Sequence, residues 1–279
     1  MGKLLAANFA RLKKDKIFWI CMGVMLLYAV VYMLNGCRQA TADLSDYSYG
    51  LDQYYFHFAA SIGLFCALFS SMFFGTEYGD GTIRNKIIIG HARQSVYLAN
   101  FLTAFTAALC MMLVWLIGAL VAVPVLGFWK MSAPNVILYL LIGVMLLAAL
   151  CSICTFVSML SVNKAMTVAL SILLVLGLIA FASMVYGSLQ EPEMSSGVSI
   201  TANGMEMSDL GPNPNYITGV KREIYEWLID FLPTGQGLLM WQLEIGNAAQ
   251  MVRMLVSSVA ITVLTTLGGI FIFKRKDLK

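Results

Sequence analysis

Apolar residues along this chain form long uninterrupted blocks, and polar residues gather in the shorter segments between them. Six blocks lack Asp, Glu, Lys and Arg and are long enough to cross a hydrocarbon core of about 30 Å as helices. They cover residues 17–34, 55–75, 98–125, 136–161, 165–189 and 255–273. The third block exceeds the length that a bilayer requires, so we expect that helix to tilt or to project beyond the lipid near Pro124. The pattern predicts an all-α membrane protein with six transmembrane helices.

Residues 1–16 precede the first block and have a different pattern. Apolar and basic residues alternate there at helical spacing, which places one set of side chains on a single side of a helix. This set is Leu4, Leu5, Asn8, Phe9 and Leu12, and Lys13, Lys14 and Lys16 follow it. We therefore expect an N-terminal amphipathic helix on the membrane surface, with a simple positive anchor for the first span as the alternative.

The longest polar segment covers residues 190–253, between the fifth and sixth spans. Its first half, 191–215, is rich in Gly, Ser, Asn and Pro and is expected to be a loop. The second half contains KREIYEWLIDFLP, in which apolar residues recur at helical spacing and acidic residues lie opposite. The acidic residues are Glu223, Glu226 and Asp230, and Pro233 ends the pattern.

A second apolar piece follows at residues 236–246, so we expect two short helices in this region. They would form a lid over the spans or a pair that dips into the membrane surface. The residues expected in the lid are Ile224, Trp227, Leu228, Phe231 and Trp241. The alternative is that these helices only pack on the ends of the spans.

The second block carries two stripes of side chains that differ in size. The small stripe, whose members are spaced four residues apart, is Ala59, Gly63, Ala67, Ser71 and Gly75. Such spacing lets two helices approach closely in lipid. Phe65, Phe69 and Phe73 form a bulky stripe elsewhere on the same helix. These faces are candidates for a contact with a second subunit or for a transport pathway, with packing inside one bundle as the alternative.

Composition and charge support membrane insertion and predict its direction. Of the 279 residues, 59% are hydrophobic and 12% are charged, and the mean hydropathy is +0.79. With six spans, the side that holds both termini carries thirteen Lys and Arg residues against four acidic residues, and the other side carries five against eleven. Positively charged residues in short loops stay inside, so both termini are expected in the cytoplasm and residues 190–253 outside.

Motifs that mark several other classes of function are absent from the sequence. No G-x-x-x-x-G-K-[ST] phosphate-binding loop occurs, so the chain is not expected to bind ATP, and no H-E-x-x-H zinc motif occurs. No span has a charged residue at its centre, where proton- or ion-driven carriers commonly place one. Five of the six cysteines fall within spans and only Cys37 falls outside, so no disulfide framework is expected. We predict no cofactor, metal or catalytic residue in this chain.

Between spans two and three, residues 76–97 form a charged segment that contains several glycines. Thr82 is a suitable N-cap for a helix over residues 83–89, in which Ile83 and Ile87 share one side. The residues expected to point away from that side are Arg84, Asn85 and Lys86. A helix of this length is not stable alone, so we expect a partner surface. The alternative is that the bases of this loop only set the orientation of the chain.

These features together resemble the permeases of ABC-2-type transporters, the membrane subunits of bacterial ABC exporters. In that family a Glu at the end of the second span leads through a Gly-Thr pair into a short cytoplasmic coupling helix that docks on a separate ATPase. The residues similar to this pattern are Glu77, Gly81, Thr82, Ile83, Arg84, Asn85, Lys86, Ile87, His91 and Arg93. The basic amphipathic N-terminus, the outer helices and the terminal FKRKDLK are also similar to such permeases. A proline often found between the coupling helix and the arginine is missing here.

The resemblance implies a function and a set of partners. Residues 1–279 would form a single permease domain in a bacterial cell membrane, paired with a second copy or a related permease. Two separate ATPase subunits would bind ATP and Mg²⁺, and no nucleic acid partner is expected. The cargo would be an amphipathic or hydrophobic compound such as a peptide, an antibiotic or a lipid-like molecule. The alternative is a non-transporting sensor, immunity or assembly module that binds a ligand with its outer region.

Overall fold

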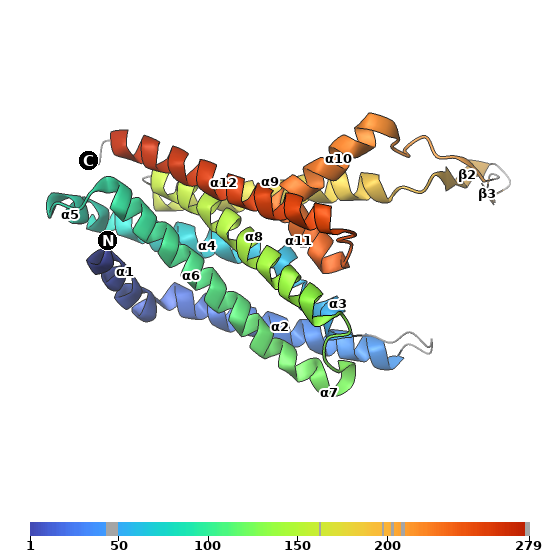
Figure 1. Cartoon of the computed structure of the whole chain (residues 1–279), viewed down its shortest axis with the longest axis horizontal. Helices are drawn as coiled ribbons and strands as arrows, with labels where there is room; N and C mark the ends of the chain where they lie inside the picture. Colours follow the sequence, from blue (N-terminus) through green and yellow to red (C-terminus); the bar gives the residue numbers. More distant parts are fainter. Residues whose placement is uncertain (43–49, 162, 197, 202–203, 208–209, 277–279) are drawn as a thin grey trace.

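The computed structural model describes residues 1–42, 50–161, 163–196, 198–201, 204–207 and 210–276. Six helices within these residues are long and apolar enough to cross a membrane, which confirms the predicted number of spans. They are α2 (Lys16–Ala42), α4 (Phe58–Gly79), α6 (Arg93–Ala119), α8 (Ala133–Leu160), α9 (Lys164–Gln190) and α12 (Ala248–Arg275). Figure 1 shows these helices running along the long axis of the molecule.

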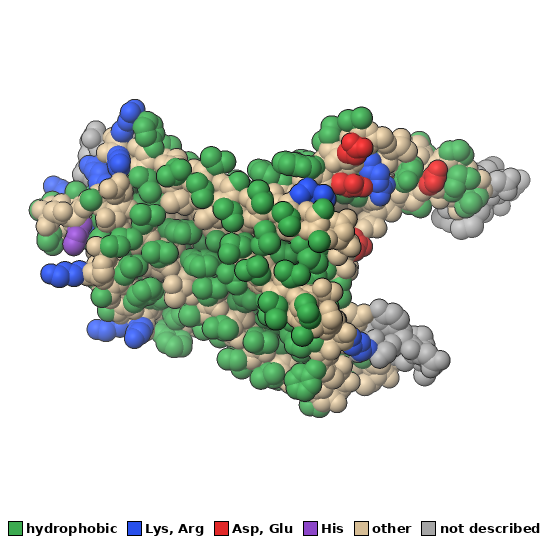
Figure 2. Space-filling view, viewed as in Figure 1, with side chains coloured by type: hydrophobic (Ala, Val, Ile, Leu, Met, Phe, Trp, Pro, Cys, Tyr) green, Lys and Arg blue, Asp and Glu red, His purple; other side chains and the backbone are tan. Residues whose placement is uncertain are grey.

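The two ends of the bundle carry different elements (Figure 1). Both termini lie at one end, together with α1 (Gly2–Lys14) and α5 (Thr82–Ile88), and we name it the α5 end. The opposite end, the α10 end, carries α3 (Leu51–Tyr55), α7 (Val123–Leu126) and α10 (Gly219–Phe231). In Figure 2, Lys and Arg side chains gather at the α5 end, and acidic side chains are visible on α10.

Helix α4 lies inside the bundle and packs against α8, α9 and α11 (Pro233–Gln242). A Cβ atom on Gly63 would lie 3.2 Å from Val175 of α9, and one on Gly237 of α11 would overlap the carbonyl of Ala59. Every member of the small stripe is buried, as are Phe69 and Phe73 of the bulky stripe, whereas Phe65 is half-buried. Most side chains of both stripes are therefore packed inside this chain.

The long third block does not continue as one helix. Helix α6 ends at Ala119, a 3-10 turn covers Leu120–Ala122, and Pro124 lies in the first turn of α7. Proline lacks the N–H that an interior helical position requires but fits a first turn. The excess length therefore forms a separate short helix at the α10 end.

The segment after α9 is not entirely a loop, and the all-α expectation is wrong there. Short strands β1 (Met194–Ser195) and β4 (Gly211–Pro212) pair antiparallel. Strand β2 (Val198–Thr201) likewise pairs with β3 (Gly204–Met207). The β-branched residues of β2 favour an extended chain, a preference that the Gly- and Ser-rich composition obscured.

Helices α10 and α11 follow, but the polar and apolar faces of α10 are not arranged as the pattern predicted. Trp227 and Ile224 are 60% and 57% exposed, whereas Asp230, expected on the polar side, is 1% exposed. Most of α11 is buried between the spans, and Trp241 donates a hydrogen bond to the hydroxyl of Tyr32 over 3.1 Å. Trp241 therefore contacts the bundle, whereas Trp227 and Ile224 remain open.

Candidate functional site

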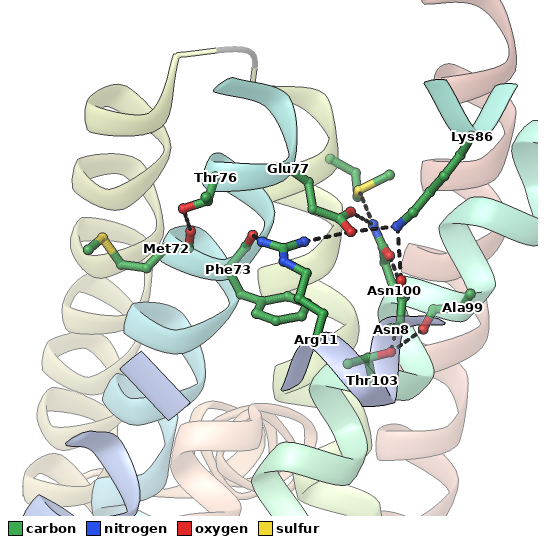
Figure 3. A network of polar contacts seen from close by, with 11 residues as sticks. Asn8, Arg11, Met72, Phe73, Thr76, Glu77, Lys86, Ala99, Asn100 and Thr103 are labelled. Carbon is green, nitrogen blue, oxygen red and sulfur yellow. Dashed lines mark hydrogen bonds and ion pairs between the residues drawn. The ribbon is translucent and has the colours of Figure 1, made fainter. Parts of the chain in front are cut away.

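A fully buried carboxylate lies at the α5 end. Glu77 is in the last turn of α4, and its side chain has no exposed surface. Figure 3 shows Arg11 of α1 and Lys86 of α5 reaching the same carboxylate. The N–O distances to Glu77 Oε1 are 2.6 Å from Arg11 and 2.5 Å from Lys86. Three separate elements of the chain thus meet at one ion-pair centre.

Amide and hydroxyl groups complete this centre. Asn100 of α6 donates to Glu77 Oε2 over 3.0 Å, and its own oxygen accepts from Asn8 of α1 over 2.8 Å. The Asn8 oxygen accepts from Lys86 Nζ over 2.9 Å, and the Asn8 amide lies 3.2 Å from the Thr103 hydroxyl. We call this set the Glu77 network: Asn8, Arg11, Glu77, Lys86, Asn100 and Thr103. Buried polar groups need such partners, because an unsatisfied one costs free energy.

Helix α1 is held to the bundle by both its apolar and its polar residues. Leu4, Asn8 and Leu12, all on the predicted apolar side, are buried. Arg11 also donates to the carbonyl of Phe73 over 2.7 Å, and its guanidinium lies 4.1 Å from the centre of the Phe73 ring. A planar guanidinium suits such combined contacts better than an ammonium does. The bulky residue Phe73 therefore supports the network directly.

Helix α5 begins one residue earlier than expected. Thr82 is the first helical residue and makes no capping hydrogen bond, because Gly81 occupies the cap position with φ of 66°. Glycine adopts this left-handed conformation without the steric cost that a side chain brings. Gly90, with φ of 98°, follows the helix end. The N-cap expected at Thr82 is thus wrong, whereas the glycine turns on both sides are present.

The two sides of α5 differ in their surroundings. Ile83 is 1% exposed and packs in a small apolar cluster at the α5 end. The other members of this cluster are Leu4, Val96, Tyr97, Ala99, Met159 and Phe273. Arg84 and Asn85 are exposed as expected, and Ile88 and Ile89 are 70% and 78% exposed. We call the exposed set Arg84, Asn85, Ile88 and Ile89 the α5 face.

Lys86 points inward, contrary to the sequence expectation that it shares the outward side with Arg84 and Asn85. Its side chain is 13% exposed because its ammonium reaches Glu77 and Asn8. A two-turn helix has no sharply defined apolar face, so the pattern alone could not place this side chain. Ile87 and His91 are half-buried, and Arg93 turns toward the end of α12.

The Glu77 network contains one fully buried carboxylate and two mostly buried cations. Hydrogen bonds between charged groups are stronger than those between neutral ones, and a low local dielectric strengthens them further. Removal of one partner from a buried ion pair is costly for the same reason. The network is therefore expected to move as one unit and to keep α1, α4, α5 and α6 in fixed relation.

Four members of the network were not predicted from the sequence as site residues. They are Asn8, Arg11, Asn100 and Thr103. A usable signal was present for two of them, because Asn100 and Thr103 are spaced three apart near the start of an otherwise apolar span. Nothing in the local pattern connects them with Glu77, which lies 23 residues before Asn100.

The described part of the chain is thus a helical, multi-spanning membrane protein with a short polar helix between its second and third spans. The family model described as ABC-2 family transporter protein matches residues 4–180, and the chain belongs to this family. The matched range contains most of α1, all of α5 and all of the Glu77 network, and it ends within α9. No curated protein matches the chain. Membership of this family makes the chain a transporter permease, that is, a membrane transport subunit.

Proposed function

We propose that the chain is the permease of an ATP-driven exporter and that the α5 face docks on a separate ATPase subunit. The observation that carries this proposal is the two-sided environment of α5. Ile88 and Ile89 are 70% and 78% exposed, while Ile83 and Lys86 hold the opposite side to the bundle. Exposed apolar residues next to polar ones are typical of a protein interface.

The proposed sidedness follows from charge. Lys and Arg side chains gather at the α5 end in Figure 2, as expected for a cytoplasmic surface. The ATPase would then lie where ATP is available, and the α10 end would face outward. This assignment places both termini and α1 on the inner leaflet and residues 190–253 outside.

The Glu77 network supplies the physical link between docking and transport. A partner shifts a conformational equilibrium only if it binds one state better than another. Closure of two ATPases would move the two α5 helices, one on each permease. Lys86 joins α5 to Glu77 of α4, and Asn8 joins α1 to α6. Movement of α5 would therefore reach two spans and the N-terminal helix together.

The docking proposal is tested by changing the exposed side of α5 alone. Ile88→Ser with Ile89→Ser, or Arg84→Ala with Asn85→Ala, should weaken binding of the co-expressed ATPase by about tenfold or more, because central interface residues contribute most of the affinity. Binding is measured by co-purification and by titration in nanodiscs. Val220→Ser is the matched control, since Val220 is 71% exposed at the other end. Unchanged binding in both double variants would exclude this face as the dock.

A cargo that is amphipathic or hydrophobic fits the apolar spans, and ATP-dependent flux in proteoliposomes would identify transport directly.

The α10 end favours a second candidate function, a module that senses an outer ligand. Between α9 and α10 lies a cavity of about 600 Å³ lined by Ser183, Glu191 and Lys221 among others, and Trp227 is an exposed residue of α10 outside its lining. Trp227→Ser with Phe231→Ser should change cargo handling without releasing the ATPase. Ligand binding without any flux would favour the sensor.

A further inference from the structure

Two cations hold the last turn of α12 at the α5 end. Arg93, the first residue of α6, donates to the carbonyl of Phe273 over 3.1 Å and also to that of Lys276. The ammonium of Lys276 donates to the carbonyls of Met159 and Leu160, each over 3.0 Å, in the last turn of α8. The final carbonyls of a helix have no partner within it, and cations are favourable there. We call these contacts the α12 clamp.

The clamp contacts the chain on both sides of α5. Tyr78, in the last turn of α4, donates its hydroxyl hydrogen to the Met159 carbonyl. Lys276 Nζ lies 3.2 Å from the Tyr78 oxygen and 4.4 Å from the centre of its ring. Tyr78 comes shortly before α5 and Arg93 shortly after it. The end of α12 therefore fixes both ends of the segment that carries the α5 face.

The first turns of α12 hold a second group of polar contacts, at the α10 end. Asp230 of α10 accepts from Arg253 over 2.9 Å and from Gln250 over 2.9 Å. Gln236 of α11 donates to the carbonyls of Asp230 over 2.8 Å and Met254 over 3.0 Å. Ser258 donates to the Gln236 side chain over 2.8 Å. We call this set the Asp230 network: Asp230, Gln236, Gln250, Arg253 and Ser258.

A single helix connects the clamp to the Asp230 network. Helix α12 runs without a break from Ala248 to Arg275, a length of about 42 Å at 1.5 Å per residue. A helix without a break or kink is a rigid element of the kind that can carry energetic coupling between distant sites. Figure 1 shows it passing from the C-terminus to the neighbourhood of α10 and α11.

We infer that α12 couples the α5 segment to the outer pair α10–α11, and that Arg93 and Lys276 are positioning residues for this coupling. The inference rests on the proposed function, in which an ATPase displaces α5. The displacement would pass through Tyr78 and Arg93 to the end of α12 and then to Asp230. Coupling between two sites is reciprocal, so a ligand on α10 would also alter the affinity of α5 for its ATPase.

Hydrogen exchange of the full-length permease in nanodiscs tests the inference without any ATPase. Lys276→Met should raise exchange rates of backbone amides in α10–α11 by about fivefold or more, the usual lower range for coupled sites. Lys274→Met is the matched control, because Lys274 is an exposed cation on the same turn and takes no part in the clamp. Lys276→Arg should restore the wild-type rates, since a guanidinium can also donate to both carbonyls.

A change confined to residues near 159 and 273 would overturn the inference, because it would mean that the clamp acts only locally. An equal rise throughout α8 would also overturn it, since that would indicate general loosening of the fold. Failure of the ATPase to bind the wild-type permease would instead reject the proposed function, and the exchange result would stand. The two failures are therefore distinguishable.

Discussion

Two buried carboxylates lie at opposite ends of this permease, and their surroundings differ. Glu77 at the α5 end is 0% exposed and meets two cations, Arg11 and Lys86. Asp230 at the α10 end has a side chain that is 2% exposed and meets one cation, Arg253. Both accept a further hydrogen bond from an amide side chain. The two sites thus share a carboxylate core but differ in the charge around it.

The two sites also differ in how far the partner cations are exposed to solvent. The cations at Glu77 are 26% and 13% exposed and come from α1 and α5, whereas Arg253 is 40% exposed and belongs to α12. Loss of Glu77 would leave two mostly buried cations without a counter-charge. Loss of Asp230 would leave one cation that can turn to water. We therefore expect the α5 end to depend more strongly on its carboxylate.

Glu77→Gln has the largest expected effect on the free energy of unfolding and tests directly whether the α5 end depends on its carboxylate. Removal of one partner from a buried ion pair costs about 3–5 kcal/mol, so the free energy of unfolding should fall by that amount. Denaturant unfolding of the detergent-solubilised permease measures it. Glu223→Gln, at an exposed acid on α10, is the control. A loss no larger than that of the control would mean that Arg11 and Lys86 find other partners.

Asp230→Asn should have a smaller effect, about 2–3 kcal/mol, because hydrogen bonds to charged groups contribute roughly that much and Arg253 can be hydrated. The same unfolding experiment gives the value. Glu226→Gln is a suitable control, since the Arg222–Glu226 pair on α10 is exposed and such pairs contribute little. If Asp230→Asn cost as much as Glu77→Gln, the exposure of the partner cation would not explain the difference between the ends.

The sequence predicted the parts of this fold that depend on local pattern. Block length gave the six spans, and the glycines around α5 gave a short separate helix. The pattern of apolar and polar residues gave a wrong expectation where a residue distant in sequence determines whether a side chain is buried. Asp230 was expected on the polar side of α10, with Glu223 and Glu226. It is buried instead, because Arg253, 23 residues away in sequence, donates a hydrogen bond to its carboxylate.

The candidate site shows the same limit. Glu77 was identified from the sequence only through the resemblance to ABC-2-type permeases, in which a Glu lies at the end of the second span. Its partners could not be identified, since Asn8 and Asn100 are 92 residues apart and meet only in the folded bundle. The inward turn of Lys86 likewise depends on the position of Glu77, not on the spacing within α5.

Gly237→Ala tests how tightly α11 packs against α4 at the α10 end, whereas the two variants above test charge. A Cβ atom there would overlap the backbone of Ala59, so α11 must shift away from α4. Overpacking of this kind typically costs about 1–2 kcal/mol, the lower part of the range for such changes. Gly177→Ala is the matched control, because a Cβ atom at Gly177 meets nothing within 4 Å. Equal stability of the two variants would show that the α10 end yields easily, and would strengthen the contrast with the α5 end.

The smallest expected effect concerns a cation at the α5 end that faces carbonyls instead of a carboxylate. Burial lowers the pKa of Lys276 from 10.5 to about 8, and the charged or titratable groups in contact with this residue are Tyr78 and Arg93. Between these two pH values the folded state has lost a proton that the unfolded state keeps. The unfolding free energy of the wild type should therefore rise with pH in this window, relative to Lys276→Met.

The expected rise is on the order of 1 kcal/mol, because solvent screens a half-buried group. It is measured as the difference between the pH profiles of unfolding for the wild type and Lys276→Met, with Lys274→Met as the exposed control. A flat difference would mean that the helix-end carbonyls of α8 stabilise the ammonium enough to cancel the cost of burial. A site built from carbonyls alone, at the same end as Glu77, would then hold a half-buried cation with no net cost in free energy.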